Sequence, residues 1–154
     1  MLLVKYILVI AHIATAAAWF GLALRLAGQA RSVVAVSGDA RTALAEDVGK
    51  SISQVGLFIL LTFIFGTANI IIAEMWPGTA INYNIAKWPY HTSVTLLLVA
   101  LGAHYAITRP AWKKVSAGDA SAAKRVAMGV GIGHLIWLTV LVLMYWPLMV
   151  PSLS

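Results

Sequence analysis

Residues 52–75 read ISQVGLFILLTFIFGTANIIIAEM, and the only ionisable side chain in this stretch is that of Glu74. A helix needs about 20 apolar residues to cross the hydrocarbon core of a bilayer. Three other stretches have the same character, so that the predicted spans are Leu3–Leu26, Ile52–Met75, Pro89–Thr108 and Val126–Leu148. The sequence therefore predicts an all-α integral membrane protein that crosses the bilayer four times.

The composition agrees with insertion into a membrane. Of 154 residues, 61% are hydrophobic and 10% are charged, and the mean hydropathy is +0.88. A soluble domain carries about a quarter charged residues, so these charges are too few to solvate a water-facing surface. The length suits one domain over residues 1–154.

Four helices with short connections predict an up-and-down four-helix bundle. The chain has no cysteine, which excludes disulfides and thiolate metal ligands.

The basic residues predict an orientation. Those that flank the first and third connections are Arg25, Arg31, Arg41, Lys50, Arg109, Lys113, Lys114, Lys124 and Arg125. Only Lys5 and Lys87 lie toward the other side. Basic loops face the cytoplasm, so we expect both termini outside, and a bacterial inner membrane is compatible with such a small cysteine-free chain. The charge of +6 indicates contact with anionic lipid and not with nucleic acid.

Two local features complete this picture. The first span is too long for a signal peptide and lacks a basic amino-terminal region with a cleavage site, so we expect it to be retained. Between the first two spans, the stretch Ala40–Val48 predicts a short surface helix.

Three of the four histidines lie well inside predicted spans, where an ionisable residue is costly and a functional candidate by default. At about 1.5 Å of rise per residue, His12 lies about 14 Å from the outer boundary. On the same scale His134 lies about 12 Å from the inner boundary, at a similar level, and His104 lies within about 6–8 Å of the cytoplasmic edge. His91 begins the third span at the outer interface.

The surroundings of these histidines leave two interpretations open. Trp19 lies two turns beyond His12 on the same face, and His134 follows the glycines Gly129, Gly131 and Gly133. Small residues permit close packing of membrane helices, or they leave room for a flat ligand. Three histidines in one small bundle favour ligation of haem iron, since facing helices can supply two axial imidazoles.

The predicted outer face carries a second candidate metal site. Met75, His91, Met144 and Met149 all fall near that boundary. Thioether and imidazole together suit Cu(I), although methionine is also an ordinary apolar filler in helices.

Two motifs resemble a known family. His12, six intervening residues and Trp19-Phe20-Gly21 resemble the first helix of the HemJ-type protoporphyrinogen oxidases and the related CopD-type copper-resistance membrane proteins. The run from Leu97-Leu98-Val99 through His104 to Arg109 is similar to the third helix of that family. With the basic loop and the last apolar helix that follow, the resemblance covers residues 1–30 and 89–147.

The resemblance implies a four-helix bundle that binds haem b, with His12 as a ligand and His104 near the tetrapyrrole. HemJ-type enzymes carry a lysine early in the third helix that serves haem binding and activity. Ser93 stands at that place here, and the span contains no lysine. The resemblance therefore does not carry protoporphyrinogen oxidation to this chain, and the second ligand falls to His134 or His104.

These observations predict a haem b-binding membrane protein with a redox role. It would take electrons from a quinol or a tetrapyrrole, or pass them to a partner subunit. By depth, His12 and His134 are the expected axial pair, with His104 as the substitute and Trp19 beside the cofactor. The alternatives are a CopD-type copper-handling protein, and a non-catalytic subunit or assembly factor whose histidines bond only between helices. The sequence is compatible with a homo-oligomer and does not determine the oligomeric state.

Overall fold

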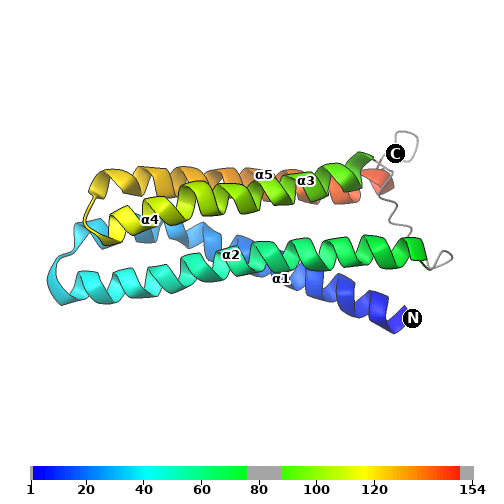
Figure 1. Cartoon of the computed structure of the whole chain (residues 1–154), viewed down its shortest axis with the longest axis horizontal. Helices are drawn as coiled ribbons and strands as arrows, with labels where there is room; N and C mark the ends of the chain where they lie inside the picture. Colours follow the sequence, from blue (N-terminus) through cyan, green and yellow to red (C-terminus); the bar gives the residue numbers. More distant parts are fainter. Residues whose placement is uncertain (1, 76–87, 150–154) are drawn as a thin grey trace.

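The computed structural model describes residues 2–75 and 88–149, which are almost wholly helical and contain no strand (Figure 1). The elements are α1 (Leu2–Ala35), α2 (Gly38–Met75), α3 (Trp88–Ala103), a π-helical turn η1 (His104–Thr108), α4 (Arg109–Ser116), a 3₁₀ turn η2 (Ala120–Ala122) and α5 (Ala123–Met149). Because α3, η1 and α4 follow one another without a break, they form one rod over residues 88–116.

In the part of the chain that the structure describes, four helical rods are long and apolar enough to cross a membrane, which confirms the predicted membrane-type four-helix bundle. They exceed the predicted spans. The 38 residues of α2 reach about 57 Å at about 1.5 Å per residue, whereas a hydrocarbon core is about 30 Å thick. The additional turns of α1 and α2 contain residues 27–35 and 38–51, where basic side chains lie.

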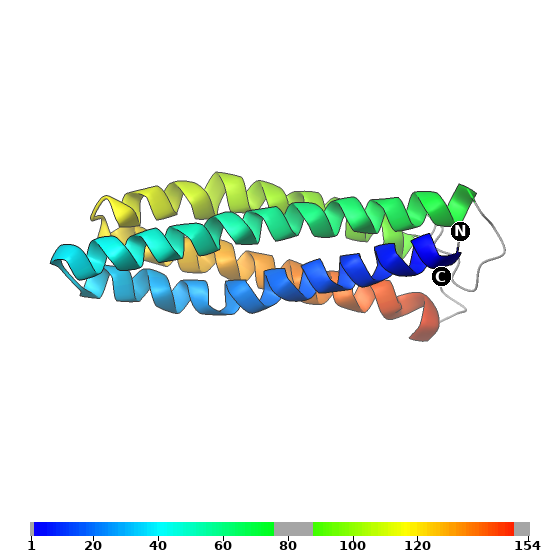
Figure 2. The same ribbon diagram turned by 90° about the horizontal axis from the view of Figure 1, so that it is seen from below.

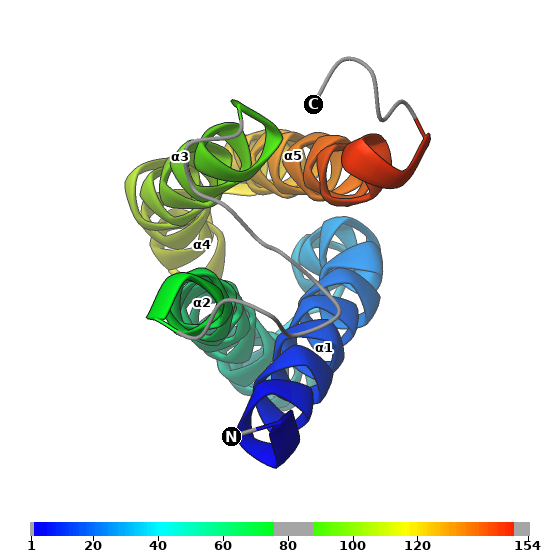
Figure 3. The same cartoon turned by 90° about the vertical axis from the view of Figure 1, so that its right-hand side faces the viewer.

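The rods run alternately up and down, and α1 packs against both α2 and α5 (Figures 1–3). The α1–α2 and α4–α5 connections lie at one end, which we call the basic end after Arg31, Arg41, Lys113 and Lys114. The beginning of α1 and the end of α5 lie at the opposite end, here called the terminal end. The fold thus places the two basic connections together, as the loop charges predict; which end faces the cytoplasm stays a prediction.

The connection between α1 and α2 corrects one prediction. Ala40–Val48 is helical, but it is the beginning of α2 and not a separate surface helix. Only Val36 and Ser37 separate the two long helices. The reversal is this short because Gly38 adopts a φ of +62°, a left-handed conformation that glycine accepts without steric cost.

The π-helical turn has a local cause in Pro110. Proline carries no backbone N–H and so cannot continue the i to i−4 hydrogen-bond pattern. Just before it, the N–H of Arg109 donates to the carbonyl of His104, five residues back. The rod therefore continues past Pro110 to Ser116 with one widened turn, and His104 begins that turn. Such turns frequently occur at functional sites.

The apolar core is concentrated in the half of the bundle nearer the basic end. Trp19, Leu26 and Val33 of α1 are almost fully buried there, and they pack with residues from each of the other rods. In the other half, Lys5 is the only buried residue of α1 before Thr15. Exposed apolar side chains such as Leu3 and Ile10 cover that part of α1, as expected for a surface that faces lipid tails. The part of α1 before Thr15, near the terminal end, is therefore packed less tightly against the other helices than the rest of α1.

The turn before α5 gives a first testable prediction. The Asp119 carboxylate accepts from the backbone N–H of Ser121 at 3.0 Å and from its hydroxyl at 2.5 Å. The hydroxyl contact is the main cause that lowers the pKa of Asp119 below its ordinary 3.8. A lowered pKa in the folded state stabilises the turn above pH 3.8, and this contribution is lost as the pH falls through the folded-state pKa. Ser121→Ala should therefore raise the carboxyl titration midpoint of Asp119, measured by NMR. An unchanged midpoint would show that the hydroxyl is not the cause.

Candidate functional site

The ring of His12 is fixed by a hydrogen bond to the neighbouring helix. Its Nδ1 lies 2.9 Å from the carbonyl oxygen of Thr62 on α2. A carbonyl oxygen can only accept, so this contact requires a proton on Nδ1, and in the neutral ring the lone pair is then on Nε2. His12 is half-buried. In its neutral form it therefore has a defined tautomer, and it lies in the first half of α1.

Two threonines and a glycine on the facing helices support this orientation. The hydroxyl of Thr62 lies 2.7 Å from the Phe58 carbonyl and 3.2 Å from the Thr15 hydroxyl. At Gly66, a Cβ atom would lie 2.9 Å from Cε1 and 3.0 Å from Nδ1 of His12. The imidazole ring of His12 therefore lies in space that would be filled by the side chain of any residue other than glycine at position 66. Sequence reasoning did not identify Thr62 and Gly66, although their spacing of four residues places them on one helix face.

His104 is the most buried of the four histidines within the bundle, with 4% of its surface exposed. Its Nε2 is buried and has no hydrogen-bond partner among the described residues. This atom is directed at α2, where a Cβ on Gly56 would lie only 2.6 Å away. The π-helical turn thus inserts the ring of His104 tightly into the core.

The interior around His104 is closely packed. A cavity of about 10 Å³ adjoins the ring, lined by Trp19, Ala23, Val55, Ile59, Ala100, His104, Thr108, Gly129, Val130 and Gly133. This volume holds about one water molecule, whereas cofactor pockets measure about 300–1,000 Å³. The layer formed by Trp19 and His104 therefore does not fit a haem macrocycle in this arrangement.

His134 lies on the side of α5 that meets α1. Its ring contacts Phe20 edge to face at 5.2 Å between centroids, and its buried Nε2 has no hydrogen-bond partner in the described part of the chain. One turn further along α5, the indole N–H of Trp137 donates to the carbonyl of Ala16 at 2.9 Å. These contacts fix the register of α5 against α1.

That register separates two of the predicted ligands. His134 lies beside Phe20, and His12 is eight residues earlier in α1, a distance of about 12 Å along the helix. His134 instead shares its level with Trp19, since Trp19 lies 3.9 Å from where a Cβ on Gly133 would stand. The cavity that joins Gly133 to His104 brings His104 to this level as well. The structure therefore groups His104, His134 and Trp19, and places His12 two turns nearer the terminal end.

The residues of the predicted copper site all lie toward the terminal end. Met75 and Met149 are 62% and 57% exposed, His91 is exposed, and Met144 is half-buried. The Trp88 and Trp146 rings, 5.8 Å apart, join α3 to α5 nearby. Among residues 2–75 and 88–149, no three histidine or acidic side chains gather as they would around a metal ion. Thioether ligation by these methionines stays a prediction.

The fold and the site define a membrane four-helix bundle in which three of the four histidines are at least partly buried. Comparison with protein-family models, curated proteins and solved structures finds no match to this chain. The functional argument accordingly depends on the geometry around these side chains.

Proposed function

We propose that this protein is a haem b-binding integral membrane protein with a redox role, and that His12 is its principal axial ligand. The observation that carries the proposal is the hydrogen bond between Nδ1 of His12 and the carbonyl of Thr62 at 2.9 Å. Histidines that bind metals almost always donate their other ring N–H to a carbonyl or carboxylate, which fixes the ring and makes the ligand nitrogen more basic. His12 has this arrangement at a depth where an unused histidine is costly.

The chain's own residues would bind and orient the cofactor. His12 supplies the ligand nitrogen, and the contact between the Thr15 and Thr62 hydroxyls joins α1 to α2 beside it. Gly66 leaves the space in which the imidazole ring lies. Haem would supply one-electron chemistry, with a potential set by the ligand and by the apolar surroundings. Quinol, a tetrapyrrole or a partner subunit are the electron partners that this role permits.

The register of α5 determines how many histidines would be able to bind the haem iron. Because His134 and His104 lie two turns from His12, we propose that His12 is the only histidine ligand in this arrangement. Ligation by His134 would require α5 to slide along α1, which would break the hydrogen bond from Trp137 to Ala16. A spectrum with bis-imidazole features would therefore indicate such a shift.

The decisive experiment is an absorption spectrum of the protein purified after expression with ample haem. We expect a Soret band in the oxidised protein and sharpened visible bands after reduction, with the pyridine adduct of haem b after extraction. Circular dichroism should show that the sample is folded. A folded but colourless protein would contradict the proposal, and stoichiometric copper in its place would favour the copper-handling alternative.

A further inference from the structure

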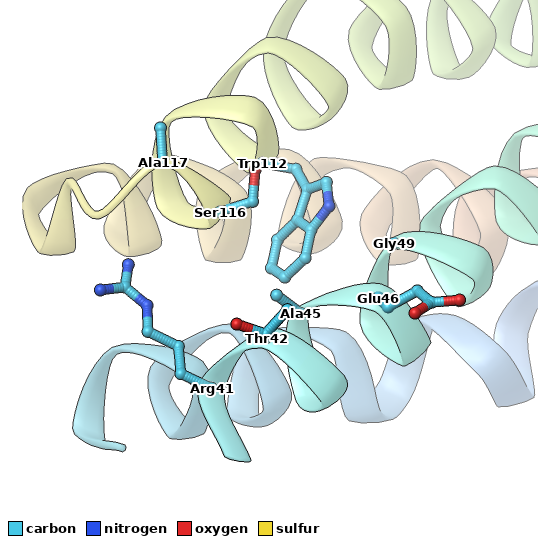
Figure 4. Close-up of a pocket in the computed structure, with 8 residues that line it drawn as sticks. All are labelled: Arg41, Thr42, Ala45, Glu46, Gly49, Trp112, Ser116 and Ala117. Carbon is cyan, nitrogen blue, oxygen red and sulfur yellow. The ribbon is translucent and has the colours of Figure 1, made fainter. Parts of the chain in front are cut away.

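A pocket of about 580 Å³ opens between α2 and α4 at the basic end, and its residue Trp112 lies about two turns along the rod from His104 (Figure 4). It is lined by Arg41, Thr42, Ala45, Glu46, Gly49, Trp112, Ser116 and Ala117. The volume is within the range of about 300–1,000 Å³ that is usual for small-molecule sites. Its lining combines a cation, an indole ring and two hydroxyls, which is a suitable set for a molecule with an anionic head and an apolar body.

Arg41 is held at the edge of this pocket. Its Nη2 donates to the carbonyl of Val115 at 3.0 Å, which joins the beginning of α2 to the end of α4. Gly118, whose φ is +111°, turns the chain closely past the guanidinium, so that a Cβ there would lie 3.5 Å from Nη2. A guanidinium has five N–H donors in a rigid fork that matches a phosphate. The hydrogen bond to Val115 uses one of them and fixes the orientation of the fork.

Trp112 forms the opposite wall. It extends from α4 toward Ala45 and Gly49 of α2 (Figure 4), and only 8% of its surface is exposed. Its Nε1 lies 3.2 Å from where a Cβ on Gly49 would stand, so this glycine lets the indole lie against α2. Tryptophan is enriched at the level of lipid headgroups. The pocket therefore lies where the apolar helices meet the basic connections.

The charge around the pocket favours an anion. Glu46 is the one acidic residue in the lining, and its carboxylate pairs with Lys50 at 2.8 Å. The hydrogen bond from Lys50 lowers the pKa of Glu46, so the pair stays ionised and contributes little net charge. Lys113 and Lys114 follow Trp112 on α4 and are exposed, and the nearby carboxylate of Asp119 interacts with Lys114. Of the charged side chains in the lining, Glu46 is thus paired, and Arg41 is the cation that forms no ion pair with a carboxylate among the described residues.

We propose that this pocket binds the phosphate headgroup of an anionic phospholipid, with Arg41 on the phosphate and Trp112 against the glycerol backbone. Basic pockets between membrane helices are suited to such headgroups. A lipid is favoured over a soluble anion because the pocket adjoins the apolar rods and has an indole wall. This site is independent of the proposed haem site, and its ligand would tie α2 to α4 at the basic end.

The sharpest test compares two neighbouring substitutions. Thr42→Glu and Ala43→Glu each add a carboxylate near the start of α2, where a negative charge stabilises a helix, and both positions are exposed. Only Thr42 lines the pocket. In native mass spectrometry from mixed phosphatidylglycerol and phosphatidylcholine micelles, we expect the wild type and Ala43→Glu to retain phosphatidylglycerol. In Thr42→Glu, the fraction of protein that carries bound phosphatidylglycerol should fall at least tenfold. The proposal would be overturned if Thr42→Glu and Ala43→Glu lost phosphatidylglycerol equally. It would also be overturned if the wild type retained phosphatidylcholine as well as it retained phosphatidylglycerol.

A second comparison tests the guanidinium and the source of the phosphate. Arg41→Gln should lose the adduct, whereas Arg31→Gln removes an exposed basic residue outside the pocket and should keep it. In a thermal-shift assay in detergent, added phosphatidylglycerol should raise the Tm of the wild type but not that of Thr42→Glu. Inorganic phosphate alone should have no such effect. An equal shift with millimolar phosphate would assign the pocket to a soluble anion and overturn the lipid proposal.

Discussion

His12→Ala should abolish the Soret absorption of the purified protein, with haem occupancy falling at least tenfold, while the bundle stays folded. The substitution removes the ring nitrogen that is oriented by the contact of Nδ1 with the Thr62 carbonyl. The fold should tolerate the change because His12 is only half-buried and the Thr15–Thr62 contact remains. The measurement is haem per protein by absorbance, with circular dichroism as the control for folding.

Two further variants separate ligation from packing. Gly66→Ala places a methyl group 2.9 Å from Cε1 of His12, which must turn the ring. Loss of the orienting environment of a metal ligand costs about 10–100-fold in affinity, so this variant should bind haem more weakly. His91→Ala, at an exposed position, should bind as the wild type does. Imidazole added to His12→Ala should restore part of the Soret band. An unchanged spectrum in His12→Ala would remove this residue as the ligand.

Gly56→Leu should cause the largest loss of stability, because there is no room for a side chain at this position. Even the Cβ atom would lie 2.6 Å from Nε2 of His104, and His104 itself is 4% exposed. Close approach at glycine is a main source of helix association in membranes. Insertion of methylene groups into a packed core costs about 1–3 kcal/mol, so Gly56→Ala should cost about that much and Gly56→Leu more. Thermal unfolding in detergent measures both.

Glycines with open surroundings provide the matched control. No side chain or neighbouring backbone lies within 4 Å of a Cβ built on Gly28 or Gly102. Alanine is favoured over glycine in a helix by about 0.8–1.0 kcal/mol, so Gly28→Ala and Gly102→Ala should be neutral or stabilising, opposite in sign to Gly56→Ala. His104→Ala should also relieve part of the cost of Gly56→Ala in the double variant. If Gly56→Ala is tolerated as well as Gly28→Ala, the close approach of His104 to α2 is refuted.

The sequence determined the class of fold because that depends on composition along the chain. A stretch such as residues 52–75, with Glu74 as its only ionisable residue, has one stable arrangement in lipid, since the helix satisfies every backbone hydrogen bond within itself. The basic residues likewise marked the two connections that the fold brings to one end. The histidines were identifiable as candidates by the same reasoning, because an ionisable group in a span is conspicuous without any structure.

The tertiary structure decided how these histidines combine. Depth counted from span boundaries placed His12 and His134 at a similar level, but the contacts of Phe20 with His134 and of Ala16 with Trp137 set a register that separates them by two turns. Register arises from the interlocking of side chains on facing helices, which the hydropathy of one helix does not encode. The partners Thr62, Gly66 and Gly56 became apparent only with α2 in place, because each acts through space on a residue of another rod.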